Sequence, residues 1–156
     1  MAYKTIDGVE YEKELLDLAE KHHPNLADCI VMETGGMKGR RKELTKDELH
    51  DRLKTGLKVE NIHSEYGMTE LFSQAYSLED GLFHTPPWMK ILLRKPTDPF
   101  EIIQTGSGGI NIIDLANIHT CSFIQTEDLG RYEGDAFKVL GRFDNSDLRG
   151  CNLLIQ

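Results

Sequence analysis

The chain has 156 residues, 39% hydrophobic and 28% charged, which is enough for one domain with its own core. Its net charge is −8, from 26 acidic and 18 basic residues, so it is not expected to bind nucleic acid backbones. No apolar run approaches the roughly 18 residues of a membrane helix, and the first residues hold no signal-peptide core. We therefore expect a cytoplasmic protein without a membrane span.

The first half is predicted to alternate helices with short strands. A helix over residues 11–22 follows from apolar residues at helical spacing, and Pro24 ends it. The apolar run LADCIVM, residues 26–32, is typical of a buried strand. The face of that first helix is predicted to carry Tyr11, Leu15, Leu18, Ala19 and His22.

A second helix is expected to start at Thr45, which forms a capping box with Glu48. Leu49, Leu53 and Leu57 would line its buried face, and Gly56 would end it. A second strand near residues 59–63 follows. The order helix, strand, helix, strand predicts an α/β layer with parallel strands.

The second half has a different pattern. Short strand candidates separated by Gly-rich and Asp-rich turns predict an antiparallel, β-rich subdomain. Pro86 and Pro87 suggest a division into residues 1–85 and residues 86–156. The strand candidates are residues 89–94, 101–104, 109–115, 122–125 and 137–140.

Two glycines follow the first predicted strand. At the carboxyl end of a strand, Gly35 and Gly36 let a flat ligand approach the backbone closely. A plain loop turn explains the same pair.

The sequence YGMTE at residues 66–70 comes where the second strand is expected to end. The ring of Tyr66 can stack on a base, the hydroxyl of Thr69 can hold a phosphate, and the carboxylate of Glu70 can bind Mg²⁺. Each residue also has a structural interpretation. Tyr66 would be part of the core, Thr69 an N-cap, and Glu70 an acid in the first turn of a helix.

Two later stretches combine turn residues with charges. TEDLG, residues 126–130, follows a predicted strand, so Asp128 is placed to accept bonds from ribose hydroxyls; an Asx-turn is the alternative. GRFDNSDLRG, residues 141–150, sets Arg142 among polar turn residues. The alternative there is a surface ion pair with one of the neighbouring aspartates, Asp144 or Asp147.

The three cysteines are widely spaced and form no CxxC pair, which disfavours a disulfide framework. Cys29 and Cys121 lie in apolar runs and are predicted to be inert core thiols. Cys151 follows an arginine and a glycine, so both an exposed reactive thiol and a buried thiol are consistent with its surroundings.

Taken together and in order, YGMTE, TEDLG and GRFDNSDLRG resemble the motifs of the adenylate-forming (ANL) superfamily of acyl-activating enzymes. The sequence around and between these motifs, such as METGGMKGRRKELT and IDLANIHTCSFIQTEDLG, is most similar to the acyl-protein synthetase (LuxE-like) family. The resemblance implies a partial ANL-type adenylation fold, an α/β layer followed by a small β-rich subdomain. It also implies ATP-dependent adenylation of a fatty acid, acyl transfer to a cysteine of the same enzyme, and delivery to a reductase partner.

The resemblance assigns roles residue by residue. Gly35 and Gly36 would lie beside the adenine, Tyr66 would stack on it, and Asp128 would bond the ribose hydroxyls. Thr69 would bond the α-phosphate and Glu70 would bind Mg²⁺. Arg142 would contact ribose or phosphate, Asp144 would mark the hinge, and Cys151 is the candidate acyl acceptor.

The superfamily's Ser/Thr/Gly-rich phosphate loop does not precede Gly35, and six residues follow Gly150. We therefore expect the C-terminal part of such an enzyme, inactive alone, with its N-terminal part as a partner and a tendency to self-associate. A non-catalytic nucleotide-binding or interaction module and a fragment of a phenylacetate-type acyl-CoA ligase remain alternatives.

Overall fold

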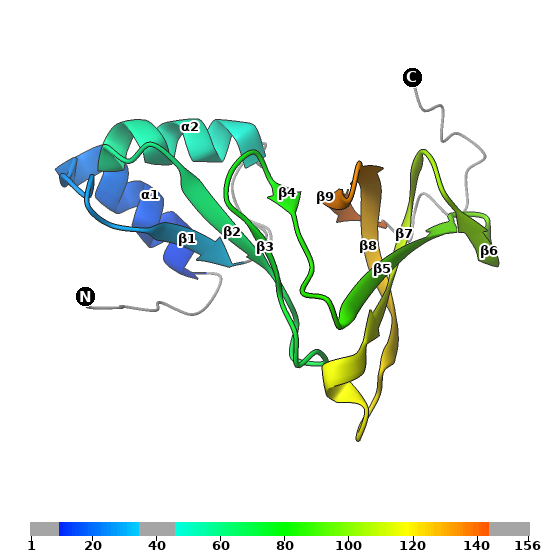
Figure 1. Cartoon of the computed structure of the whole chain (residues 1–156). Helices are drawn as coiled ribbons and strands as arrows, with labels where there is room; N and C mark the ends of the chain where they lie inside the picture. Colours follow the sequence, from blue (N-terminus) through cyan, green and yellow to red (C-terminus); the bar gives the residue numbers. More distant parts are fainter. Residues whose placement is uncertain (1–9, 35–45, 144–156) are drawn as a thin grey trace. The chain divides into compact units, whose positions relative to one another are not determined.

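The computed structural model describes residues 10–34 and 46–143 (Figure 1). These residues form two compact units. Unit 1 contains the described residues up to Met68 together with Gln74–Phe83, and unit 2 contains Thr69–Ser73 together with those from His84 onward. The predictions for Gly35, Gly36, Asp144 and Cys151, and for the Thr45 capping box, lie outside the described residues.

Unit 1 is a small α/β layer, as the sequence predicts. Its elements run α1 (Glu10–His22), β1 (Val31–Thr34), α2 (Lys46–Leu57), β2 (Ile62–Tyr66), β3 (Ala75–Ser77) and β4 (Leu82–Phe83). Strand β1 pairs in parallel with β2, Val31 lying opposite Ile62, and β3 adds antiparallel to β2. The predicted parallel pairing is therefore confirmed.

Both strands of the parallel pair begin later than predicted. The prediction that residues 26–32 form a strand is wrong for its first part, because the backbone N–H of Cys29 donates to the carbonyl of Leu26 and closes a turn there. Strand β2 likewise extends to Tyr66. The later end of β2 makes Tyr66 a strand residue rather than part of the loop that follows.

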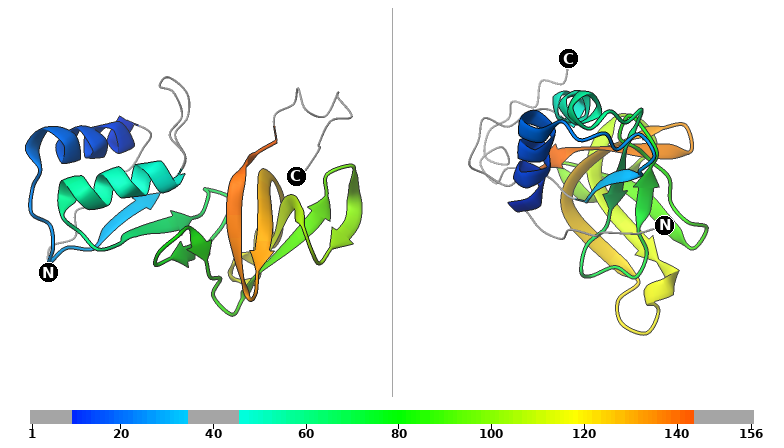
Figure 2. Two further views of the ribbon diagram at one scale, coloured as in Figure 1. Left: turned by 90° about the horizontal axis from the view of Figure 1, so that it is seen from above. Right: turned by 90° about the vertical axis from the view of Figure 1, so that its left-hand side faces the viewer.

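The core of unit 1 lies between the helices and the sheet. Leu49, Leu53 and Leu57 are buried, as predicted, and they cluster with Val31 and Ile62 of the strands. Figure 2 shows both helices on the same side of the sheet. Helix α1 contributes Leu16 and Ala19 to this core, with Leu15 partly buried; the predictions for Leu18 and His22 were wrong, since both are exposed.

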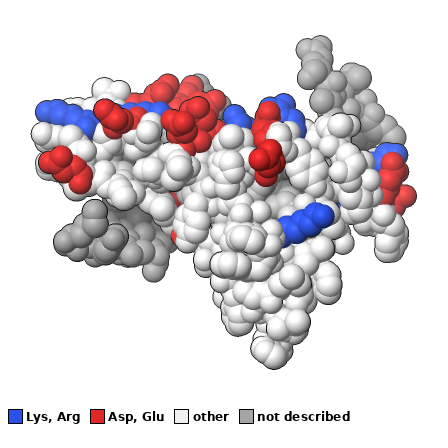
Figure 3. Space-filling view, viewed as in Figure 1, with Lys and Arg blue, Asp and Glu red and all other residues white. Residues whose placement is uncertain are grey.

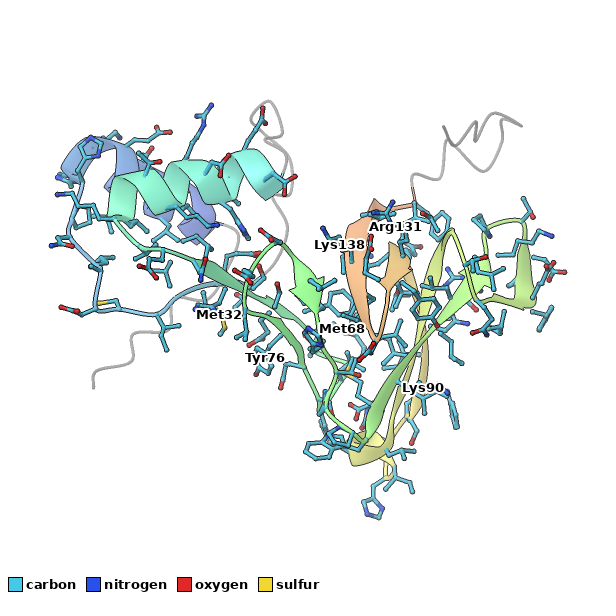
Figure 4. The ribbon with its side chains drawn as sticks, turned by 45° about the horizontal axis from the view of Figure 1, so that its top comes forward. Met32, Met68, Tyr76, Lys90, Arg131 and Lys138 are labelled. Atoms are coloured by element: carbon cyan, nitrogen blue, oxygen red, sulfur yellow. The ribbon has the colours of Figure 1, made fainter. Side chains whose placement is uncertain are left out.

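The face of this sheet opposite the helices carries large, exposed side chains. Met32 on β1 and Tyr76 on β3 are both exposed there (Figure 4). Along β1 and β3 these exposed residues alternate with buried ones, which is the period of two expected for a strand. The sheet of unit 1 is thus covered on one face only within the described residues.

Gly56 does not end helix α2, contrary to the sequence prediction. The helix continues through Leu57, and the left-handed backbone that often follows a helix is adopted by Lys58, with φ 59°. A Cβ at Gly56 would lie 2.6 Å from the Cβ and 2.7 Å from the carbonyl oxygen of Ala19. Glycine is therefore required here for the close approach of the two helices.

Unit 2 is an antiparallel sheet with the strand order β9–β8–β7–β5–β6 (Figure 1). All of its pairings are antiparallel, which confirms the predicted β-rich second half. Its elements are β5 (Met89–Lys95), β6 (Asp98–Ile103), β7 (Ser107–Asp114), the short 3-10 helix η1 (Leu115–Asn117), β8 (Phe123–Glu133) and β9 (Ala136–Arg142). None of the described helices has the length and hydropathy needed to cross a membrane.

Charge and apolar surface are unevenly distributed in this view of the molecule. Acidic side chains gather over the helices, whereas the part of unit 2 around η1 shows no charged side chains at its tip (Figure 3). Large apolar side chains of unit 2 are exposed near that end of the sheet, at Phe72, Trp88, Leu115, Ile118 and Phe123. A cluster of this kind is typical of a surface that contacts another protein segment.

Candidate functional site

Asp128 and Arg142, predicted from two separate motifs, are direct cross-strand partners on β8 and β9. The Nε of Arg142 lies 3.3 Å from Oδ1 of Asp128, and its Nη2 lies 3.6 Å from Oε2 of Glu127. Asp128 is mostly buried with 16% of its side chain exposed, whereas Arg142 is 57% exposed. The pair thus places a half-exposed cation beside a carboxylate held by the sheet.

The TEDLG stretch is not a loop at a strand end, as the sequence suggested, but lies inside β8. The prediction of an Asx-turn there was therefore wrong as well. The ladder is irregular at this point, because its register with β9 shifts between Leu129 and Gly130. The backbone N–H of Asp128 donates to Oγ1 of Thr126, and the Thr126 hydroxyl donates to the carbonyl of Ile110.

A buried arginine supports this part of the sheet. Arg94 on β5 is 7% exposed, and its guanidinium donates to the carbonyl of Thr126 at 2.6 Å and to that of Ile110 at 3.0 Å. A third bond reaches Oδ1 of Asn111 at 2.8 Å. Burial lowers the pKa of Arg94, yet a guanidinium remains charged at neutral pH.

Two further features surround that guanidinium. Its cross-strand neighbour is Gly109, where a Cβ would lie 2.4 Å from Cζ of Arg94, so only glycine leaves room for the buried side chain. The ring of Phe143 covers Cζ at 5.4 Å, and the Phe143 backbone N–H donates to the carbonyl of Glu127. Arg94 therefore contacts Thr126, two residues before Asp128 in sequence, and Phe143, the residue after Arg142.

Tyr66 is the last residue of β2 and belongs to unit 1. Its side chain is only 9% exposed, and its ring lies 5.9 Å from that of Phe83 at an angle of 60°. This is an ordinary aromatic packing geometry. The position at the carboxyl end of a parallel strand fits the predicted adenine contact, while the burial fits the core alternative.

Thr69 and Glu70 form an exposed turn at the start of the Thr69–Ser73 segment, which belongs to unit 2. No helix follows them in this described part of the chain, so the alternatives of an N-cap and a first-turn acid were wrong. The segment has no strand or helix of its own. Its conformation must therefore be fixed by contacts with other elements.

Asp114, at the end of β7, makes several of those contacts. It is fully buried, and Oδ2 accepts the backbone N–H groups of Phe72 and Ser73, each at 2.9 Å. Oδ1 accepts the Ser73 hydroxyl at 2.7 Å and the N–H of Ala116 at 3.1 Å. Burial alone would raise the pKa of Asp114, but these hydrogen bonds outweigh it, so the pKa lies below its usual value.

The two described cysteines were predicted wrongly, because both Cys29 and Cys121 are exposed. Cys29 lies in the turn before β1, and Cys121 precedes β8 with its thiol donating to the carbonyl of Phe123. Among the described residues, no group of three or more His, Cys, Asp or Glu side chains is arranged to hold a metal ion. Glu70 is therefore not part of such a group within the described ranges.

No protein-family model matches the chain, and no curated protein matches it. Solved structures do match its fold. O-succinylbenzoate coenzyme A synthetase from Bacillus subtilis, in complex with ATP and magnesium ion, is 19% identical with a TM-score of 0.57, over 83% of this chain and 30% of that one. A benzoate CoA ligase from Burkholderia xenovorans is 19% identical with a TM-score of 0.53, over 87% and 30%.

Apo MatB from Rhodopseudomonas palustris is 15% identical with a TM-score of 0.51, over 84% of this chain and 33% of that chain. These neighbours belong to the ANL adenylate-forming superfamily. At such identities the likeness establishes the fold, and the chain has a partial ANL-type adenylation fold, as predicted. It spans about a third of the length of each of these structures.

The supporting residues Arg94 and Asp114 were missed at the sequence level. A charged residue within the apolar run of β5, opposite the Gly108–Gly109 pair, was the available signal for Arg94. From the sequence, Asp114 looks like an ordinary polar residue at the end of an apolar strand. Its role depends on the Thr69–Ser73 segment, which lies far away in sequence.

Proposed function

We propose that this chain carries the adenosine side of the active site of an AMP-forming acyl-activating enzyme, of the acyl-protein synthetase (LuxE-like) kind. The observation that carries the proposal is the contact between Asp128 and Arg142, which come from two different motifs and meet at 3.3 Å across β8 and β9. The shared adenylation fold is consistent with it.

The described side chains suit the proposed roles. The carboxylate of Asp128 can accept bonds from the two ribose hydroxyls, while Arg142 beside it balances part of the carboxylate charge and has an exposed guanidinium for ribose or phosphate. The exposed Thr69 hydroxyl can donate to an α-phosphate oxygen. As the resemblance implies, we also propose that Tyr66 contacts the adenine and that Gly35 and Gly36, outside the described residues, lie beside the base.

Glu70 fits magnesium brought in with ATP rather than a metal held by the protein alone. Mg²⁺ in nucleotide sites usually keeps several waters and takes one or two carboxylates plus substrate phosphates. A single exposed carboxylate, with no cluster of ligands around it in the described ranges, matches that pattern. Bound there, the ion would neutralise charge on the phosphates.

The proposed reaction has two steps. A carboxylate oxygen of a fatty acid attacks the α-phosphorus of ATP, and the bond to pyrophosphate breaks. The thiolate of Cys151 then attacks the acyl carbon, forming a thioester as AMP leaves with the electron pair of the broken bond. A reductase partner would take the acyl group from that thioester.

The chain alone is not expected to complete this reaction. It spans about a third of the length of its structural neighbours, and we propose that a phosphate loop and most of the acid pocket belong to an N-terminal part of the enzyme. The exposed apolar residues near η1 support a surface that another segment covers.

Titration with AMP, followed by backbone amide NMR, tests the adenosine site directly in the isolated chain. We expect shifts at Asp128 and Arg142 and a dissociation constant below about 1 mM. Asp128→Ala should weaken binding at least about tenfold, because a charge-assisted hydrogen bond is lost. Asp135→Ala removes an exposed acid from the turn of the same hairpin and should leave binding unchanged.

The proposal would be refuted if up to roughly 10 mM AMP moved neither resonance, or if Asp135→Ala weakened binding as much as Asp128→Ala. Tyr66→Ala measures the adenine contact separately. Loss of AMP binding with an intact amide spectrum would favour stacking over a purely structural role.

Acyl-CoA ligase activity is the second candidate, because two of the structural neighbours are CoA ligases or synthetases by name. The two functions differ in their acyl acceptor. In the enzyme that includes the phosphate-loop part, labelled fatty acid with ATP should attach to Cys151, and Cys151→Ser should abolish labelling. Full labelling of the Ser variant, or transfer to free coenzyme A without labelled protein, would rule out Cys151 as acceptor.

A further inference from the structure

The Thr69–Ser73 segment is held at two points by buried polar side chains from one short stretch of unit 2. Asp114 fixes its C-terminal end through the N–H groups of Phe72 and Ser73. Asn117, at the end of η1, fixes its N-terminal end, because Nδ2 donates to the carbonyl of Glu70 at 2.7 Å. A stretch of four residues thus spans the whole segment with hydrogen bonds.

Asn117 is well suited to hold a peptide group in one orientation. It is only 2% exposed, and its Oδ1 accepts a hydrogen bond from the Thr120 hydroxyl, so the amide donates on one side and accepts on the other. The bond reaches the backbone of Glu70 and leaves its carboxylate unengaged by this contact. The hydrogen bond from Asn117 therefore fixes the orientation of the Glu70 peptide group.

The sole tryptophan of the chain is part of the same network. Nε1 of Trp88 donates at 2.9 Å to Oγ of Ser73, and that hydroxyl in turn donates to Asp114. The Trp88 carbonyl also accepts the N–H of Leu115. Its fluorescence consequently reports on whether the segment is anchored.

We propose that Asn117, together with Asp114, is a positioning residue that preorganises Glu70 for a metal-bound polyphosphate. The proposal rests on the proposed function for the role of Glu70. A segment without secondary structure would otherwise have to lose backbone freedom when the ligand binds, which would weaken binding. The hydrogen bonds of Asn117 and Asp114 impose that order in advance, which favours binding.

The experiment compares two ligands in the same variants. AMP without metal tests the contacts of Asp128, while ATP with Mg²⁺ also engages Glu70. In Asn117→Asp, which keeps the shape but removes the donor, we expect AMP affinity within about twofold of wild type and ATP–Mg²⁺ affinity lowered about tenfold. Thr120→Ala removes the neighbouring partner of Asn117 but keeps the bond to Glu70, and should retain most of the ATP–Mg²⁺ affinity.

A second measurement keeps the inference testable without nucleotide. In Asp114→Asn, hydrogen exchange at the amides of Phe72 and Ser73 should accelerate at least about tenfold, and Trp88 emission should change. Equal weakening of AMP and ATP–Mg²⁺ in Asn117→Asp would show a merely structural role and overturn the inference.

Unchanged amide exchange in Asp114→Asn would overturn it too, whatever the nucleotide data. Failure of the wild-type chain to bind either nucleotide would refute the proposed function. The anchoring of the segment would then be judged by the exchange rates alone.

Discussion

Replacing Arg94 by methionine tests whether the buried guanidinium holds the sheet of unit 2 together beneath Asp128. Methionine fills much of the same volume and avoids a large cavity, so the main loss is hydrogen bonding. The carbonyl of Thr126 and Oδ1 of Asn111 lose the bonds that Arg94 donates, whereas the carbonyl of Ile110 keeps the Thr126 hydroxyl.

The size of the effect follows from these contacts. Each buried or partly buried acceptor left without a donor costs about 1–3 kcal/mol, so two of them predict a loss of roughly 2–6 kcal/mol in the free energy of unfolding. Part of this is offset because the variant no longer buries a charge for which no carboxylate partner is observed within the described residues. We therefore expect a net loss of about 2–4 kcal/mol.

Urea unfolding followed by Trp88 fluorescence measures this quantity, since the only tryptophan lies in unit 2. Lys90→Met is the matched control: it removes an exposed cation from the same strand and should change stability by no more than about 0.5 kcal/mol. Arg94→Lys keeps a charge but lacks the planar fork, so it should fall near Arg94→Met. If Arg94→Met and Lys90→Met were equally stable, the reasoning would be wrong.

Two further predictions concern packing and pH. Gly56→Ala should destabilise the chain by about 1 kcal/mol despite the better helix propensity of alanine, because the new Cβ would lie 2.6 Å from that of Ala19; thermal melting by circular dichroism checks this, and a more stable variant would contradict it. Thr55→Ala, exposed on the same helix, is the control and should be neutral or slightly stabilising. Because the folded-state pKa of Asp114 is lowered, its contribution to the free energy of unfolding is complete above the ordinary pKa of 3.8 and is lost as pH falls through the folded pKa. Asp114→Asn should therefore be less stable at neutral pH by about 1–3 kcal/mol and should lose less stability on acidification, as urea titrations at several pH values would show; parallel curves for the two proteins would refute the assignment.

The elements of this fold were largely predictable because their patterns are local. Leucines at Leu49, Leu53 and Leu57 repeat at helical spacing, and each of them is buried. Strand boundaries were less accurate, as β1 shows, because a short apolar run does not reveal where a turn such as the one at Cys29 ends. The length of β8 was missed for a similar reason: the charged residues Glu127 and Asp128 suggested a loop.

Of the candidate site, the sequence indicated Asp128 and Arg142 but not the buried groups that contact the same strands. Asp128 and Arg142 were found from motif resemblance, and their pairing across β8 and β9 could not be read from either motif alone. Gly56 was misassigned because a glycine near a helix end indicates a cap when the neighbouring helix is not known. Its contact with Ala19 shows that it allows two helices to pack closely instead. Contacts between distant parts of the chain decide such cases, and a sequence pattern does not contain them.

Two buried residues that lie between the motifs stabilise the structure around the candidate site. Arg94 and Asp114 both lie between YGMTE and TEDLG in sequence. Arg94 donates to the carbonyl of Thr126 in TEDLG, and Asp114 accepts the backbone N–H groups of Phe72 and Ser73, just after YGMTE. Each is an ionised group in the interior, which is unfavourable unless several partners are arranged around it. A protein that carried the motif residues without these two groups would have the chemical functions of the site but not their fixed positions. The Arg94 and Asp114 variants should consequently weaken nucleotide binding without removing any residue that we propose to contact the nucleotide.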